Sequence, residues 1–157
     1  MPPYVAVVGA GVPERGLAPV AEEVGRRLAE RGAVTLCGGL TGVMEDVCRG
    51  ARAAGGTTVG ILPGDDRRAA NEFVDVAIAT GMGEMRNALI VRAADAVIAI
   101  GGEFGTLSEV AFALKIGRRV VGIETWDLTR KSGAHDPILR AATAEEAVAL
   151  ALDGLRG

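Results

Sequence analysis

Aromatic and basic side chains are scarce in this 157-residue chain. Only 3% of the residues are Phe, Trp or Tyr, which leaves few rings on which the bases of a single-stranded nucleic acid could stack. The 17 Lys and Arg residues are outnumbered by 20 Asp and Glu residues, and the formal net charge is −3. A nucleic-acid-binding surface needs an excess of positive charge, so we expect no nucleic-acid partner.

Histidine, cysteine and long apolar runs are also rare. His135 is the single histidine, and Cys37 and Cys48 are wrongly spaced for a zinc site, so we expect no metal centre and place both thiols in the core. No apolar run approaches the roughly 18 residues of a membrane span, and the chain enters an apolar strand at once, without a signal peptide. These features predict a cytoplasmic protein with no membrane partner.

Common cofactor-binding signatures are missing or incomplete. The first glycine turn, Gly9-Ala10-Gly11, opens like a dinucleotide fingerprint, but Glu14 stands at the position of the third glycine. The chain has no GxxxxGK[ST] phosphate loop and no GxSxG nucleophile turn, and its only lysines are Lys115 and Lys131. We therefore expect no NAD, no Walker-type ATP site and no pyridoxal Schiff base, and no bound cofactor of any kind.

Apolar, strand-like runs alternate with helical patterns along the whole chain. The expected strands are residues 4–9, 34–37, 57–62, 73–80, 96–100 and 119–123, and a last helix follows the capping sequence Thr143-Ala144-Glu145-Glu146. Uniformly apolar strands separated by helices predict one α/β domain over residues 1–157, a Rossmann-like doubly wound parallel sheet with helices on both faces. We expect the first strand to be central, with strands two and three on one side and the later strands on the other.

Glycine turns follow several of these strands. They are Gly9-Ala10-Gly11, Gly38-Gly39, Gly81-Met82-Gly83 and Gly101-Gly102. In a parallel sheet, the turns that leave a strand and enter a helix share the carboxyl edge, where free backbone N–H groups and helix N-termini bind phosphate. The sequence therefore predicts one ligand crevice at this edge.

One cation and one anion are expected beside the crevice. Arg86 lies near the start of a helix predicted over residues 85–93, and Glu109 lies near the start of a helix predicted from Thr106. Both have structural alternatives. Thr106-Leu107-Ser108-Glu109 has the spacing of a helix capping box, and Arg86 is equally expected as a solvated or salt-bridged residue. Residue spacing by itself leaves these alternatives open.

Three motifs together resemble those of the lonely-guy (LOG) family: CGGLTGVME at residues 37–45, the pair Met85-Arg86, and GGEFGTLSE at residues 101–109. The chain is more similar still to the short branch of that superfamily that includes molybdenum cofactor carrier proteins. The resemblance implies a phosphoribohydrolase that cleaves the N-glycosidic bond of a nucleoside 5′-monophosphate and releases base and ribose 5-phosphate. It also implies a homo-oligomer, dimer or tetramer, which agrees with the apolar helix surfaces predicted at residues 85–93 and 111–113.

The resemblance assigns roles to particular residues. Arg86 and Glu109 match the catalytic pair; Glu109 is expected to stabilise a cationic sugar and hold the attacking water, and Arg86 to keep it ionised or to grip the ligand. The earlier glycine turn and the phosphate-binding turn match at Gly38, Gly39, Gly42, Gly102, Gly105 and Thr106. The sheet-edge argument adds Gly9 and Gly11 to the ligand-binding residues.

Some positions depart from the family pattern. Gly101 replaces a proline, Glu103 and Leu40 replace glycines, and Asn87 stands where the enzymes usually carry lysine. Glu103 places a negative charge beside the expected phosphate site. The alternative function is therefore a non-catalytic carrier of a phosphate-bearing, nucleotide-like ligand such as the molybdenum cofactor. The retained catalytic pair favours the enzyme, whereas the replaced glycines and the small size favour the carrier.

Overall fold

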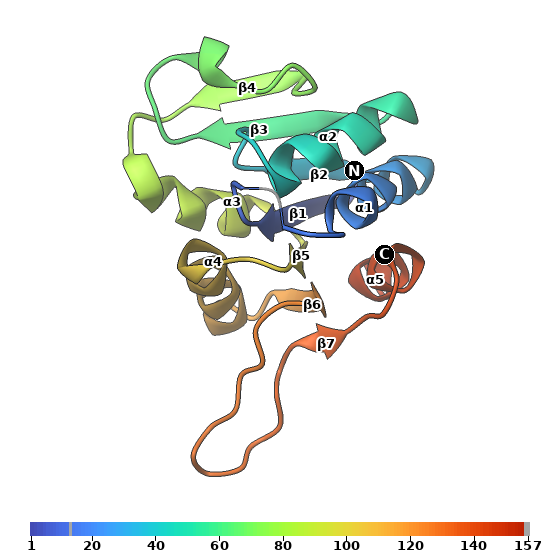
Figure 1. The fold of residues 1–157 in the computed structure, drawn as a ribbon, viewed down its shortest axis with the longest axis vertical. Coiled ribbons are helices and arrows are strands. Elements are labelled where there is room, and N and C mark those ends of the chain that lie inside the picture. Colours follow the sequence, from blue (N-terminus) through green and yellow to red (C-terminus); the bar gives the residue numbers. More distant parts are fainter. Residues whose placement is uncertain (13, 156–157) are drawn as a thin grey trace.

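A computed structural model describes residues 1–12 and 14–155, and its core is a seven-stranded parallel sheet (Figure 1). The order of the strands across the sheet is β4-β3-β2-β1-β5-β6-β7. The doubly wound α/β class predicted from the sequence is confirmed, with the first strand at the centre of the sheet. The strands are β1 (Tyr4–Gly9), β2 (Val34–Cys37), β3 (Thr58–Leu62), β4 (Val76–Ala79), β5 (Ala96–Ile100), β6 (Arg119–Ile123) and β7 (Leu139–Arg140).

Helices cover both faces of this sheet. One face is covered by α1 (Ala18–Glu30), α2 (Val43–Ala53) and α5 (Ala144–Leu152), and the other by α3 (Asn87–Ala93) and α4 (Phe104–Lys115), as Figure 1 shows. Two short 3-10 turns, η1 (Arg67–Ala69) and η2 (Gly83–Arg86), lie in the connections before β4 and before α3. Because each helix follows a strand, α2, α3 and α4 all begin near the carboxyl edge of the sheet.

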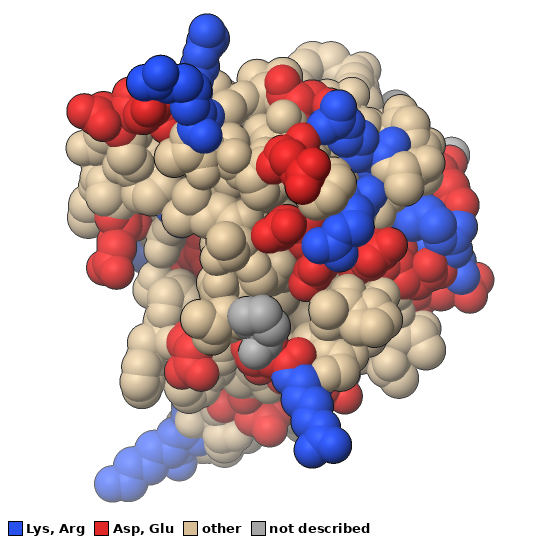
Figure 2. Space-filling view, turned by 45° about the horizontal axis from the view of Figure 1, so that its top comes forward, with Lys and Arg blue, Asp and Glu red and all other residues tan. Residues whose placement is uncertain are grey.

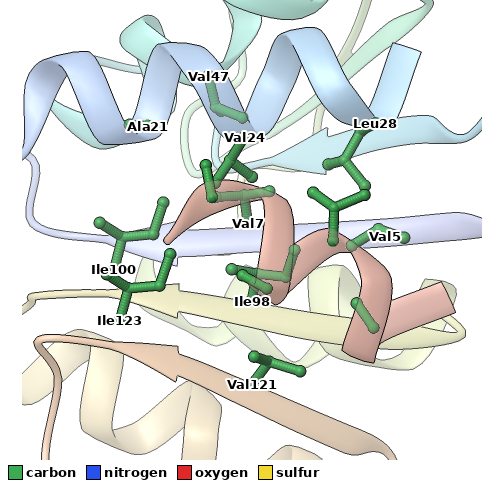
Figure 3. Packing of buried hydrophobic residues seen from close by; sticks show 14 of the residues in the cluster. Val5, Val7, Ala21, Val24, Leu28, Val47, Ile98, Ile100, Val121 and Ile123 are labelled. Atoms are coloured by element: carbon green, nitrogen blue, oxygen red, sulfur yellow. The ribbon is translucent and has the colours of Figure 1, made fainter. Parts of the chain in front are cut away.

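The residues of β1 alternate between two buried layers. Val5 and Val7 pack beneath α1, where Val24 and Leu28 point toward them (Figure 3), whereas the neighbouring residues of β1 join the layer beneath α3 and α4. Since both faces of β1 and β5 are covered, apolar residues run continuously along these two strands rather than at every second position. This double burial explains why the sequence shows continuous apolar runs.

The predicted place of the fourth strand is wrong. β4 pairs in parallel with β3, with Val76 opposite Val59, and so lies on the same side of β1 as β2 and β3. It is also shorter than predicted. Phe73 and Val74 pack against the core before the strand begins, and Val76 and Ile78 are exposed because β4 forms the edge of the sheet. The chain crosses to the other side of β1 only after β4.

The connection after β6 contains a strand that the sequence did not reveal. This connection projects from the body of the molecule and returns through β7, a two-residue strand that pairs with β6 (Figure 1). Two residues are too few for a recognisable apolar pattern. The predicted start of the last helix is confirmed, because the Thr143 hydroxyl accepts a hydrogen bond from the Glu146 N–H at 3.1 Å.

Charged side chains of both signs are interspersed on the face shown in Figure 2. Ion pairs lie along α1 and α2, among them Arg26 with Glu23 and Arg49 with Asp46. Exposed pairs of this kind each contribute little to stability. In the described part of the chain, no helix combines the length and apolarity that a membrane crossing requires.

Candidate functional site

A cavity of about 290 Å³ opens at the carboxyl edge of the sheet, where β1 ends. The connection after β1 leads to α1 on one face of the sheet, whereas the connection after the neighbouring β5 leads to α4 on the other face. Ligands of doubly wound sheets bind where neighbouring strands diverge in this way. The volume is close to the lower end of the usual range for small-molecule sites. The cavity is lined by residues 7–12, Gly38, Met44, Arg86, Asn87, Glu103, Gly105, Thr106 and Glu109.

Most of the residues singled out from the sequence line this cavity. Those in its wall are Gly9, Gly11, Gly38, Arg86, Gly105, Thr106 and Glu109. Three predicted glycines belong to the same turns but lie outside the lining: Gly39, Gly42 and Gly102. Gly39 donates its N–H to the Cys37 thiol, and Gly42 immediately precedes α2.

The turn Gly81-Met82-Gly83 does not reach the cavity, so this part of the predicted crevice is wrong. The N–H groups of Gly81 and Gly83 donate to the carbonyl oxygens of Gly64 and Pro63, which joins the turn after β4 to the turn after β3. The turn follows the edge strand of the sheet rather than a strand next to β1. Its distance from the cavity is thus a direct consequence of the strand order.

Arg86 links three segments of the chain by hydrogen bonds beside the cavity. Its side chain is buried, with a residue exposure of 9%, and Nη1 donates to the carbonyl oxygens of Gly38, at 2.6 Å, and Ile61. Nε donates to Oδ1 of Asn87 at 2.9 Å. The guanidinium therefore holds the ends of β2 and β3 against the start of α3. A Cβ at Gly38 would lie 2.6 Å from Nη1, so any larger residue there would force the guanidinium to shift.

Glu109 faces the same cavity from α4. This helix begins at Phe104, with Glu103 at its N-cap, so Thr106 is already inside the first turn. The capping-box explanation of Glu109 is therefore wrong, and among the described residues no hydrogen bond of the Glu109 carboxyl is found. The side chain is 8% exposed. A buried carboxyl group that points into a cavity without a partner is available to a ligand.

Burial also changes the protonation of Glu109. Desolvation raises the pKa of its carboxyl to about 8, and the positive charge of Arg86 opposes this shift only in part. Glu109 is thus mostly a neutral acid at pH 7, and the expectation that Arg86 keeps it ionised is wrong at that pH. Burial in turn lowers the pKa of Arg86, while the charge of Glu109 acts in the opposite direction.

The start of α4 contains a contact that sequence reasoning missed. Gly102 donates its N–H to Oε1 of Glu14, at 2.7 Å, across a separation of 88 residues. Gly102 has φ +105°, and a Cβ there would overlap the side chain of Thr106, so only glycine is accommodated. In the sequence, Glu14 is visible only as the residue that breaks a dinucleotide fingerprint. No local pattern indicates that it reaches the turn after β5.

Comparisons with known proteins agree with this geometry. A sequence model of the SLOG cluster4 family matches residues 2–148. The molybdenum cofactor binding protein of the phototrophic bacterium Rippkaea orientalis is 36% identical, with a TM-score of 0.87 over 96% of this chain and 95% of that one. The molybdenum cofactor carrier protein of Chlamydomonas reinhardtii is 30% identical, with a TM-score of 0.85 and complete coverage of both chains, 100% each.

A probable cytokinin riboside 5′-monophosphate phosphoribohydrolase of Oryza sativa subsp. japonica is 30% identical over 122 residues. The aligned part is 76% of this chain and 50% of the rice protein, so the chain spans about half the length of that relative. The resemblance to the lonely-guy superfamily and to its molybdenum cofactor carrier branch, first indicated by the three sequence motifs, is confirmed.

Proposed function

Because the chain belongs to the SLOG cluster4 family, we propose that it binds and carries a phosphate-bearing, nucleotide-like ligand without cleaving it. The ligand enters the cavity at the carboxyl edge of the sheet. The molybdenum cofactor, the ligand of the two structural relatives, is the candidate cargo. Those relatives align with this chain over nearly its whole length, whereas the hydrolase relative aligns over half of its own length.

Carriage is supported by the protonation of Glu109 and by the hydrogen bonds of Arg86, the two residues expected to be catalytic. Cleavage through a cationic sugar is helped by a carboxylate beside it. With a pKa of about 8, only about a tenth of Glu109 is ionised at pH 7. Arg86 already donates to three oxygen atoms of the protein and so serves the wall of the cavity. Both residues are thus better suited to shaping and hydrogen-bonding a ligand than to stabilising a cation.

The chemistry of the cavity fits the parts of such a ligand. The backbone N–H groups in the first turn of α4 and the Thr106 hydroxyl are donors for a phosphate. Val12 and Met44 provide apolar side chains at the cavity for a planar ring. The neutral Glu109 acid donates a hydrogen bond to an acceptor on that ring or on its linker. No step of this binding needs a metal ligand from the protein.

A second candidate function is the phosphoribohydrolase activity of the lonely-guy enzymes. It is favoured by one specific observation, namely that Arg86 and Glu109 share the cavity and that the Glu109 acid holds a proton at neutral pH. Such an acid suits protonation of the departing base. The C–N bond then breaks with its electron pair going to the protonated base, and water adds to the sugar carbon and returns a proton to the Glu109 carboxylate, which gives ribose 5-phosphate.

Purified protein incubated with a panel of nucleoside 5′-monophosphates separates the two functions. Carriage predicts no ribose 5-phosphate with any of them, together with saturable binding of a molybdopterin-type pterin followed by tryptophan or pterin fluorescence. Glu109→Gln is a matched control, because it keeps a hydrogen-bonding side chain and removes the acid. Release of ribose 5-phosphate by the parent protein but not by this variant would reverse the assignment.

A further inference from the structure

The Glu14 carboxylate lies against the backbone turn that opens α4. Oε1 accepts the hydrogen bond of the Gly102 N–H at 2.7 Å, and Oε2 lies 2.6 Å from the place where a Cβ of Gly101 would stand. The two glycines together leave room for the carboxylate. An acidic side chain from the loop after β1 thus occupies one of the backbone donors at this helix start.

The same region is otherwise equipped to hold an anion from a ligand. The first N–H groups of α4 have no acceptor within the helix, and the helix dipole favours negative charge there. Independently of the helix, the hydroxyl of Thr106, a residue only 3% exposed, faces the cavity and makes no hydrogen bond among the described residues. Glu109 is likewise buried at the cavity without a hydrogen-bond partner in that part of the chain. These groups indicate a ligand site rather than a closed helix end.

We propose that Glu14 is a specificity-determining residue, a resident anion on the turn that opens α4, whose negative charge opposes a phosphate at the first turn of that helix. The inference rests on the proposed function and deepens it. A free phosphate brings only its own charge, which the negative charges of Glu14 and of Glu103 at the cavity wall repel. A phosphate joined to a ring system gains apolar contacts in the cavity that offset this repulsion. The site therefore selects joined phosphates over free phosphate.

Glu14→Gln tests this with little change of shape, because the amide oxygen still accepts from Gly102 while the charge is removed. Isothermal titration with inorganic phosphate is expected to show binding about tenfold tighter in Glu14→Gln than in the parent protein, the effect of one close like charge. Glu14→Ala is expected to show a similar gain. Glu72→Gln removes a charge from an exposed residue beside the end of α2 and is expected to leave phosphate affinity unchanged.

A second measurement needs no variant. The amide resonance of Gly102 in the parent protein is expected to shift when a phosphate-bearing pterin or nucleoside 5′-monophosphate is added, because the phosphate binds at the neighbouring helix start and its charge acts on the Glu14 carboxylate that this N–H binds. Equal phosphate affinity in the parent protein and Glu14→Gln, or no phosphate binding by either, would overturn the role of Glu14. The carrier function fails on a different result: no binding of pterin or nucleotide by the parent protein, whatever Glu14→Gln does with inorganic phosphate.

Discussion

The folded protein is expected to lose stability as the pH rises, because Glu109 must then give up its proton. Replacing Glu109 with glutamine is expected to remove this loss. The carboxyl has a pKa of about 8 in the folded chain against an ordinary value of 4.5. Between these two values the folded protein keeps the proton while the unfolded chain has released it. The proton's contribution to the free energy of unfolding is therefore at its full value below pH 4.5. It decreases as the pH rises and is lost once the pH has passed through 8.

The size of this effect follows from the two pKa values. Each unit of difference corresponds to about 1.36 kcal/mol, so the total loss is about 5 kcal/mol, and about 4 kcal/mol of it falls between pH 5 and pH 9. The glutamine side chain does not titrate in this range. The free energy of unfolding of Glu109→Gln, relative to the parent protein, is thus expected to increase by about 4 kcal/mol from pH 5 to pH 9.

Urea unfolding of both proteins at pH 5, 7 and 9 measures this difference, and the remaining titrating groups cancel between them. Glu72→Gln, in an exposed position, is the control and is expected to show a nearly constant difference from the parent protein. A constant difference for Glu109→Gln across the same pH range would refute the reasoning, because it would mean that the Glu109 carboxyl is as well solvated in the folded protein as in the unfolded chain.

Other regions of the molecule give further expectations. Arg86→Lys should lower the free energy of unfolding by about 2–4 kcal/mol in urea titrations, because one ammonium cannot reach the three oxygens that the guanidinium binds. Thr143→Ala should cost about 1 kcal/mol by the same assay, through loss of the α5 cap, and Thr143→Ser should restore most of it. Sedimentation at micromolar concentration should show a species heavier than the 16.0 kDa chain, because Met85 and Phe104 are 70% and 75% exposed; a purely monomeric boundary would contradict this.

The central part of the fold could be predicted from the sequence because its physical cause is local. β1 and β5 are apolar at every position since helices cover both faces of the sheet, and glycine turns mark their ends. The position of β4 could not be predicted in this way. Its apolar residues are compatible with either edge of the sheet, and the choice depends on which connection crosses to the other side of β1.

The candidate site likewise has features that the sequence predicts and features that it does not. Residues within recognisable turns and helix starts, such as Gly38 and Thr106, were placed at the cavity edge from the sequence pattern. The role of Glu14 depends on a contact between distant segments, and the protonation of Glu109 depends on how deeply α4 buries it. Neither the contact nor the burial has a signature in the neighbouring residues. Long-range packing, rather than local spacing, therefore determines the chemistry of the site.

The proposal of carriage without cleavage is tested most directly by recovering the bound ligand. The protein is mixed with a smaller amount of a phosphate-bearing pterin or a nucleoside 5′-monophosphate, so that nearly all of the ligand is bound, and after prolonged incubation at pH 7 the complex is isolated, denatured and analysed by mass spectrometry. Carriage predicts that the ligand is recovered intact and in proportion to the protein that bound it. Recovery of free base and ribose 5-phosphate in place of an intact nucleotide would contradict the account.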